Sequence, residues 1–406
     1  MKRDSHGRPA RVVFWAGSFE QAGTQRFLVE LLRRLDRAAF RPTVFSVLKE
    51  GPLLSEIERL EVPVLEFRTG RSPASAATLR GLTAAAAHLW RERVDIVSPM
   101  LGITTLFGPL VARAAGVPVV VNHQRNLSYW IDNRLEERAY GFVSRSVVDA
   151  VLVNSRAAGD ELADRFRVPA RKIVDVGVGI DVRRFDGVER DRRLAADLGL
   201  GGAPVVGIVG KLSPVKGHEF FLEAAAAVAR ERGDVRFLVV GDGTRRAELE
   251  GLAAALGLSG RVVFAGARND VPAVLRLMDV FTLSSVSEGA PHAVMEAMAA
   301  GLPIVATDVG GVMDVVGGPS AAVLVPPRDP SAMARGILRL LQDPSEARAM
   351  GAALGRAARE RHDVGAVVRR VEDAFLRVLA ERAPHRVPAC RRSQVAPAGI
   401  VRERVT

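Results

Sequence analysis

Cysteine, aromatic residues and long apolar runs are all scarce in this sequence. Cys390 is the one cysteine among 406 residues, which excludes a framework of disulfides and fits a reducing compartment. No apolar run reaches the roughly 18 residues that a membrane-spanning helix requires. The basic N-terminal residues are not followed by the apolar stretch of a secretion signal. These absences lead us to expect a cytoplasmic protein.

Acidic residues are fewer than basic ones. The chain has 46 Asp and Glu against 57 Lys and Arg, a net charge of +11. The surplus lies in residues 1–190, which carry +7, and in residues 382–406, which carry +5. Such a surplus can attract phosphate, nucleic acid or an anionic membrane, and a general bias towards arginine explains it equally well. Aromatic residues make up only 5% of the chain, so the stacking platform of a nucleic-acid-binding protein is not expected.

Metal-binding and cofactor-binding patterns are missing as well. The sequence has no Asp-x-Asp and no cluster of His and Cys, so it predicts no dedicated metal site. Gly241-Asp242-Gly243 begins like a dinucleotide-binding fingerprint, but the third glycine is absent. That departure argues against a nicotinamide cofactor, and we predict no cofactor.

Short β-rich runs alternate with helical patterns along the chain. Most runs are continuously apolar, as in parallel strands that are buried on both faces. The expected strands are Val12–Ala16, Thr43–Val47, Val62–Phe67, Asp95–Ser98, Pro118–Asn122, Ala150–Asn154, Val205–Val209, Arg236–Val240, Val262–Ala265, Val280–Leu283, Ile304–Thr307 and Ala322–Val325. A dozen parallel strands exceed the usual size of one sheet. We therefore predict an α/β protein with two doubly wound domains that face a central cleft, where ligands bind at the carboxyl ends of strands.

The domain boundaries follow from changes in composition. The charged, glycine-rich stretch Asp186–Gly202 precedes a fresh strand, so we expect a first domain over 1–186 and a second over 187–365. A helix over 366–381 is expected to return to the first domain. The segment 382–406 is rich in proline and arginine, and we predict that it is disordered.

One motif follows the expected strand Val205–Val209 and opens a helix. It contains Gly210, Lys211, Lys216, Gly217 and His218. The glycines allow close approach of a ligand to the backbone, and the two lysines lie beside a helix N-terminus, which favours anions. This arrangement suits a diphosphate, and the alternative is a surface loop with solvated lysines.

A second motif follows the expected strand Val280–Leu283. Gly289 and Ala290 precede Pro291, which suits the first turn of a helix. The unpaired N–H groups of that turn can bind phosphate. Glu288 lies just before the helix and Glu296 within it, so that the two carboxylates can reach different parts of one ligand. The alternative is a capping carboxylate at Glu288 and a surface glutamate at Glu296.

Two weaker signals lie near the N-terminus. Gly23 precedes an expected helix over Thr24–Leu35 and can face a donor or acceptor, but such a turn is common in α/β folds. His123 follows the strand Pro118–Asn122 and is either a polar group at the cleft or an ordinary loop residue. The residues themselves favour the ordinary reading of His123.

Together these motifs resemble those of glycosyltransferase family 4, whose members have the two-domain GT-B fold. The likeness covers about residues 11–380. It rests on Gly210-Lys211-Leu212-Ser213-Pro214, Lys216-Gly217-His218, Gly241-Asp242-Gly243, the pair Glu288 and Glu296, Glu296-Ala297-Met298-Ala299-Ala300-Gly301-Leu302-Pro303, and Thr307-Asp308-Val309-Gly310-Gly311.

The resemblance implies a Rossmann-like acceptor-binding domain followed by a Rossmann-like domain for a UDP- or GDP-linked sugar. It implies that Lys211 and Lys216 neutralise the donor diphosphate, that Glu288 lies near the transferred sugar and that Glu296 binds the ribose. It also implies that the backbone of four residues binds phosphate, namely Gly210, Gly289, Ala290 and Pro291. Gly23 is implied to lie in a loop that faces the phosphate and the acceptor. His123 is implied to lie near the reaction centre.

Three positions depart from the family pattern. Lys211 stands where the family usually has Arg, which keeps the charge but loses bidentate geometry. Ala22 replaces the first glycine of a usual Gly-Gly pair, and Val178 replaces a usual Asn. No charged group of the donor site is lost, so the resemblance still implies activity.

The implied reaction is transfer with retention of anomeric configuration, without a metal, to a glycan, a lipid-linked glycan or a small molecule. The resemblance also implies a place in cell-envelope polysaccharide biosynthesis. A sugar-nucleotide epimerase of the same fold is the alternative, and a phosphorylase with pyridoxal phosphate is a third reading. The basic first half, where Arg91 and Arg93 flank Leu89 and Trp90, also predicts peripheral contact with the inner membrane surface, unless the leucines belong to the core.

Overall fold

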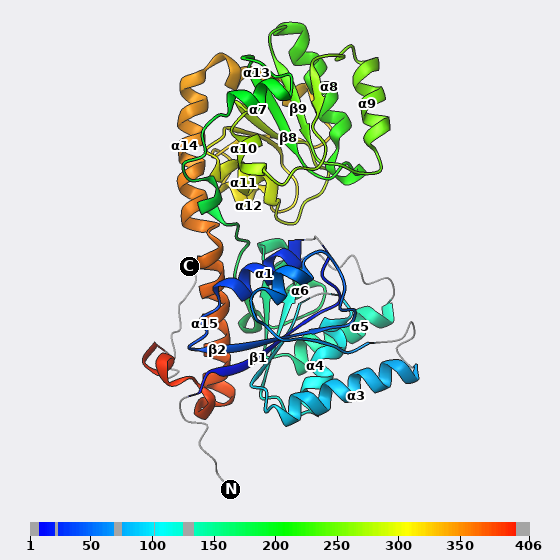
Figure 1. The fold of residues 1–406 in the computed structure, drawn as a ribbon, viewed down its shortest axis with the longest axis vertical. Coiled ribbons are helices and arrows are strands. Elements are labelled where there is room, and N and C mark those ends of the chain that lie inside the picture. The colour runs from blue at the N-terminus through cyan, green and yellow to red at the C-terminus, as the bar shows by residue number, and fades with distance from the viewer. Residues whose placement is uncertain (1–7, 21–22, 69–74, 101, 125–133, 395–406) are drawn as a thin grey trace. The chain divides into compact units, whose positions relative to one another are not determined.

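The chain folds into two compact units in a computed structural model (Figure 1). The structure describes residues 8–20, 23–68, 75–100, 102–124 and 134–394. Contacts group Met1–Gly177 with Gly365–Thr406 in an N-terminal unit, and Val178–Val364 form a C-terminal unit. Each unit is described by itself.

A parallel sheet of seven strands forms the centre of the N-terminal unit. Its strand order is β3-β2-β1-β4-β5-β6-β7. The strands are β1 (Ala10–Ala16), β2 (Phe40–Ser46), β3 (Val64–Glu66), β4 (Ile96–Pro99), β5 (Val119–Gln124), β6 (Ala150–Val153) and β7 (Ile173–Asp175). The order reverses between β1 and β4, so that the carboxyl ends of these two strands form the switch point of the sheet.

Helices cover both faces of this sheet. They are α1 (Gly23–Arg34), α2 (Leu54–Glu58), α3 (Ala76–Arg91), α4 (Thr104–Ala114), α5 (Arg134–Phe142), α6 (Arg156–Asp164) and α15 (Val364–Arg382). Ser75 caps α3 by accepting a hydrogen bond from the Thr78 N–H. The ring of Phe375 in α15 lies 6.1 Å from Phe14 and 6.0 Å from Phe40, measured between centroids. The last long helix therefore completes the core of the first unit.

The C-terminal unit has a parallel sheet of six strands in the order β10-β9-β8-β11-β12-β13. The strands are β8 (Val205–Val209), β9 (Arg236–Val240), β10 (Val262–Phe264), β11 (Val280–Leu283), β12 (Ile304–Thr307) and β13 (Val323–Val325). The helices are α7 (Arg192–Asp197), α8 (His218–Glu231), α9 (Arg246–Ala255), α10 (Val271–Leu275), α11 (His292–Ala299), α12 (Val312–Val316), α13 (Pro330–Gln342) and α14 (Pro344–Arg361).

Two apolar clusters bury the two faces of the second sheet. Side chains from α10, α11, α12 and α14 make up one cluster, and side chains from α8, α9 and α13 make up the other. Both faces of each strand are thus covered, which is why the strands read as continuous apolar runs. Here β8 and β11 are parallel neighbours. The strand order continues from β8 to β9 on one side and from β11 to β12 on the other, so the switch point lies between β8 and β11.

The predicted fold class of two doubly wound α/β domains is confirmed. The predicted central cleft between them stays a prediction. The structure places the division after Gly177 and Val364, rather than after the predicted positions 186 and 365, because residues from Val178 onward already pack in the C-terminal core.

The prediction of a disordered segment over 382–406 is wrong for residues 382–394. Arg382, Arg386 and Arg391 lie 2.8 Å from the carboxylates of Asp149, Asp95 and Asp36. The prolines and arginines of this segment predicted disorder, whereas in the structure three of the arginines have acidic partners. Residues 395–406 lie outside the described part of the chain.

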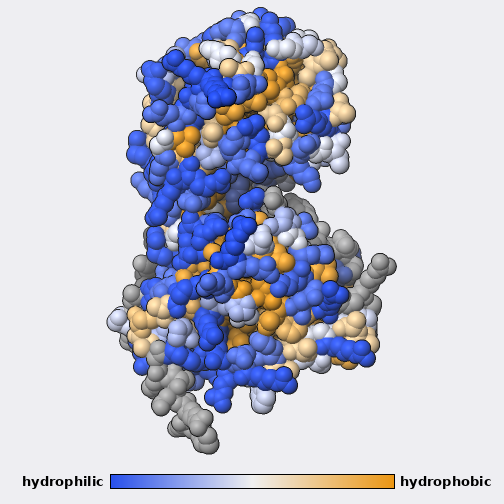
Figure 2. Space-filling model, in the orientation of Figure 1, coloured by the Kyte–Doolittle hydropathy of each residue, from blue (hydrophilic) through white to orange (hydrophobic). Residues whose placement is uncertain are grey.

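The hydropathy of the visible surface is mixed, with apolar residues scattered among hydrophilic ones in each unit (Figure 2). No helix among the described residues is long and apolar enough to cross a membrane.

Candidate functional site

Two loops meet at the carboxyl edge of the C-terminal sheet, where β8 and β11 end. The loop after β8 runs from Gly210 into a short 3-10 turn, Pro214–Lys216, and the loop after β11 runs to Pro291. The Val286 N–H donates to the Val215 carbonyl at 2.9 Å, and the Ser284 hydroxyl donates to the Lys216 carbonyl at 3.0 Å. Both predicted motifs are therefore held against each other at the switch point.

An ion pair links the two loops. The Lys216 Nζ lies 2.6 Å from Glu288 Oε1, and the Glu288 side chain is 8% exposed. The Ser285 hydroxyl donates to the same oxygen at 2.6 Å. The structure thus brings together the lysine and the glutamate that the sequence singled out. Ser285 was missed, although its place directly after an apolar strand was a usable signal.

The remaining predicted donor-site residues surround this pair. Lys211 is exposed beside Gly210, whose N–H donates to the Val240 carbonyl at 2.9 Å. Glu296 is the fifth residue of α11 and is half-buried. Three residues lead into that helix, namely the half-buried Gly289 and Ala290 and the buried Pro291. Pro291 is the N-cap of α11, rather than part of its first turn as predicted.

Neighbouring loops approach the site so closely that only glycine fits. Gly310, after β12, has φ +53°, and a Cβ built there would lie 1.7 Å from the Glu288 carbonyl oxygen. A Cβ on Gly241, after β9, would lie 1.9 Å from the Gly210 carbonyl oxygen. The glycines of the Gly241-Asp242-Gly243 and Gly310-Gly311 motifs therefore set backbone positions in the loops that carry Gly210 and Glu288.

His123 and Gly23 belong to the N-terminal unit. His123 lies within β5 rather than after it, and its side chain is buried. The His123 Nε2 is 2.9 Å from the Ser98 hydroxyl of β4. Gly23 is the exposed first residue of α1. Both lie at the carboxyl edge of the first sheet, and residues 21–22 and 125–133 beside them lie outside the described part.

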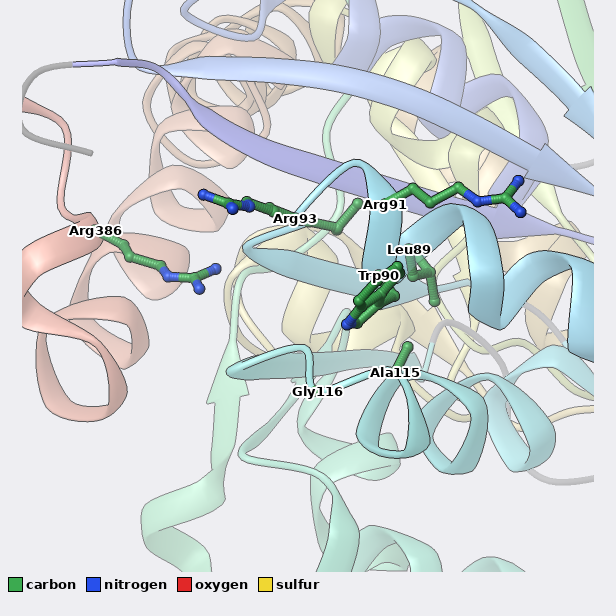
Figure 3. A pocket seen from close by; sticks show the side chains of 8 residues that line it. Leu89, Trp90, Arg91, Arg93, Ala115, Gly116 and Arg386 are labelled. Carbon is green, nitrogen blue, oxygen red and sulfur yellow. The ribbon is translucent and has the colours of Figure 1, made fainter. Parts of the chain in front are cut away.

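A separate concavity of about 590 Å³ lies at the opposite, amino edge of the first sheet. Its lining includes Leu89, Trp90, Arg93 and Arg386, with Gly116 from the turn after α4 (Figure 3). Val94 and Gly116 precede β4 and β5, so this pocket is remote from His123 and Gly23 within the same unit. It is not part of the predicted site.

No group of three or more His, Cys, Asp or Glu side chains among the described residues is placed to hold a metal ion. Metal independence stays a prediction, as do the individual roles of Glu288, Glu296 and His123.

Comparison with known proteins identifies the family of the chain. Residues 22–184 match the family described as Glycosyltransferase Family 4, and residues 203–343 match Glycosyl transferases group 1. The chain is 34% identical over 257 residues to 2-deoxystreptamine glucosyltransferase of Streptomyces kanamyceticus, covering 59% of this chain and 65% of that one. The match thus spans just under two thirds of that relative.

Longer matches extend over most of the chain. It is 31% identical over 359 residues to 2-deoxystreptamine N-acetyl-D-glucosaminyltransferase of Streptomyces fradiae, covering 80% of this chain and 84% of that one. Its fold is similar to that of Anabaena HepE, solved in complex with UDP, with a TM-score of 0.80 and 21% identity, over 90% of this chain and 99% of that one. The chain belongs to glycosyltransferase family 4, and its two parallel α/β units are those of the GT-B fold.

Proposed function

We propose that this chain is a retaining glycosyltransferase that moves a sugar from a nucleoside-diphosphate sugar to an acceptor hydroxyl without a metal. The observation that carries the proposal is the Lys216–Glu288 pair at 2.6 Å on two loops at a switch point. Open α/β sheets bind ligands at such points. The structure of HepE, which has the same fold, contains UDP, and this supports a UDP-linked donor, with a GDP-linked donor as the second candidate.

The charges fit departure of a diphosphate. Breaking the glycosidic bond leaves negative charge on the nucleoside diphosphate and positive charge on the sugar. Lys216, Lys211 and the N-terminal end of α8 can stabilise the former, and Glu288 can stabilise the latter. The acceptor hydroxyl then attacks the face from which the diphosphate departs, and the departing phosphate takes its proton.

The names of the relatives support a polyhydroxylated acceptor. Both Streptomyces relatives are named for transfer to 2-deoxystreptamine, an aminocyclitol. We include such cyclitols among the acceptors, beside the glycans and lipid-linked glycans that the resemblance implies. His123 is proposed to lie near the reacting sugar.

A transfer assay tests the function. UDP- and GDP-sugars are supplied with and without a panel of cyclitol and glycan acceptors in the presence of EDTA. Release of nucleoside diphosphate only when acceptor is present supports the proposal. Conversion of the donor sugar without acceptor supports the epimerase instead, and activity that returns only on addition of magnesium contradicts metal independence.

The two glutamates are assigned separate tasks, and kinetics with matched variants test them. Glu288→Gln is expected to lower kcat, since the carboxylate is proposed to face the reacting sugar. Glu296→Gln is expected to raise the KM for the donor, since it is proposed to bind the ribose. Identical effects of the two variants would contradict this assignment.

Helix α3 is the element proposed for the peripheral membrane contact. Leu79 and Trp90 are 64% and 68% exposed and lie eleven residues apart, on one side of the helix, while Leu89 is buried. Arg80 and Arg91 are exposed beside them. The proposal requires that the protein co-sediments with vesicles rich in anionic phospholipid at low salt, and that Leu79→Ser with Trp90→Ser abolishes this binding.

A further inference from the structure

His218 occupies an unusual place for a polar side chain. It is the first residue of α8, directly after Lys216 and Gly217, and it is 1% exposed. Neither of its ring nitrogens has a hydrogen-bond partner among the described residues. Because buried polar atoms are nearly always paired, an imidazole whose two nitrogens find no partner among the described residues points to a partner beyond them.

The ring borders the loop that carries the diphosphate in the proposed function. Side chains in a helix lean towards its N-terminus, and the first residue of α8 therefore leans over the end of β8. A Cβ built on Gly210 would lie 4.0 Å from His218 Cε1 and 3.9 Å from the Lys216 side chain. His218 and Lys216 thus flank the same glycine.

The backbone holds the ring in this place. Gly217 has φ +59°, and a Cβ there would lie 2.3 Å from the Ser284 carbonyl oxygen. The turn before α8 is therefore packed directly against the loop after β11. Since α8 has 14 residues and its inner side is buried in the core, its first residue has little freedom to turn away.

The ring is neutral near pH 7. Burial lowers the pKa of His218 to about 4, and the charges of Lys216 and Arg245 act in the same direction. A neutral imidazole has one N–H donor and one acceptor nitrogen. It can therefore donate to an anionic oxygen without adding a further cation beside Lys216.

We infer that His218 is a further donor-binding residue whose ring N–H donates to a phosphate oxygen of the nucleoside diphosphate held between Gly210 and Lys216. The inference rests on the proposed function. It adds to the two lysines a directional contact, which fixes the orientation of the diphosphate rather than its charge balance.

Calorimetric titration with UDP and with uridine isolates the phosphate contact. His218→Phe keeps a ring of similar size but has no donor, and His218→Gln keeps an N–H. We expect His218→Phe to weaken UDP binding by about tenfold or more, as for the loss of a hydrogen bond to a charged group, with uridine binding unchanged. His218→Gln is expected to retain more of the affinity for UDP.

A second buried histidine of the same unit is the matched control. The ring nitrogens of His362 lie 3.3 Å from the Val178 carbonyl and 2.8 Å from the Val315 carbonyl. His362→Phe should therefore lower Tm without changing the ratio of UDP to uridine affinity, whereas His218→Phe should change that ratio without a matching loss of Tm. GDP and guanosine are titrated in parallel.

The outcomes separate the inference from the proposed function. Wild-type protein that binds neither UDP nor GDP overturns the proposed function and the inference with it. Wild-type protein that binds a nucleoside diphosphate, with His218→Phe equal to it in affinity, overturns the inference alone. A His218→Phe variant that loses uridine and UDP binding equally also overturns it, because the ring would then act on the fold of the site.

Discussion

Lys216 has two partners to satisfy, since it is bonded to Glu288 in the structure and is proposed to bind the diphosphate as well. We expect Lys216→Ala to lower the rate of transfer by at least about a hundredfold, because a preorganised charge at the leaving group is lost. Lys211→Arg keeps the charge at an exposed position and is expected to stay within a few-fold of wild type. Steady-state rates with a fixed acceptor measure both. Near-normal turnover of Lys216→Ala would place the donor elsewhere.

His218 also makes stability depend on pH. Its pKa falls to about 4 in the folded chain, by burial and by Lys216 and Arg245, against 6.5 for a free histidine. Between these two pH values the unfolded chain binds a proton that the folded chain does not. The free energy of unfolding therefore falls as pH drops from 6.5 to 4, by about 3 kcal/mol over the whole range. Above pH 6.5 the ring is neutral in both states, and His218 causes no further change in stability.

Urea unfolding at pH 7, 5.5 and 4.5 measures this dependence. His218→Gln removes the titrating group and is expected to show a shallower loss of stability across the window. Parallel curves for the variant and the wild type would show that folding does not lower the pKa of His218.

At the scale of elements, the strands of the second half follow directly from the sequence. Val205–Val209, Val280–Leu283 and Ile304–Thr307 were predicted with their observed bounds, because a parallel strand with both faces covered must be apolar throughout. The three-residue strand β7, Ile173–Asp175, was missed. It is too short for its pattern to stand out, and its pairing with β6 exists only in the assembled sheet.

The candidate site was predictable to a similar degree. Lys216 and Glu288 lie 72 positions apart. The residues alone placed each of them after a strand, and the resemblance to the family assigned both to one donor site. The hydroxyl partners of two predicted site residues were not predicted, namely Ser285 for Glu288 and Ser98 for His123. These contacts depend on side-chain positions that no spacing rule supplies.

The loop after β12 supports the loop after β11 through a single glycine, and this can be tested. Gly310→Ala would place a methyl group against the Glu288 carbonyl in a left-handed backbone. We expect transfer to be lost and unfolding to become easier by more than about 1 kcal/mol. Gly251→Ala is the control, since it lies within α9 with open space around it and should raise stability. Thermal melts and transfer rates report both, and wild-type behaviour of Gly310→Ala would contradict the observed packing.

At the scale of the whole molecule, arginines at the end of α15 and just after it pair with acidic side chains at the amino edge of the first sheet. The side chains of Asp95 and Asp149 are 1% and 2% exposed, and Arg386 and Arg382 pair with them from the C-terminal segment. A chain ending at Glu381 loses both arginines, so that Asp95 keeps only Arg8 and Asp149 keeps only Arg113 among their arginine partners. Each buried carboxylate then has one cation fewer, which costs stability. We expect Tm to fall by roughly 5 °C.

A chain ending at Gln394 keeps every one of these pairs and is the matched control for the shorter truncation. It should melt like the full-length protein. Equal melting temperatures for all three chains would show that the arginine pairs contribute nothing to stability.

The C-terminal segment that completes the N-terminal unit also affects the order in which the two units can fold during synthesis. The N-terminal unit is made of two separated segments, Met1–Gly177 and Gly365–Thr406, whereas Val178–Val364 are continuous. The half that leaves the ribosome first therefore cannot cover Phe14 and Phe40 until Phe375 has been made. The C-terminal unit, which is translated later, has all of its residues available sooner and can finish folding first.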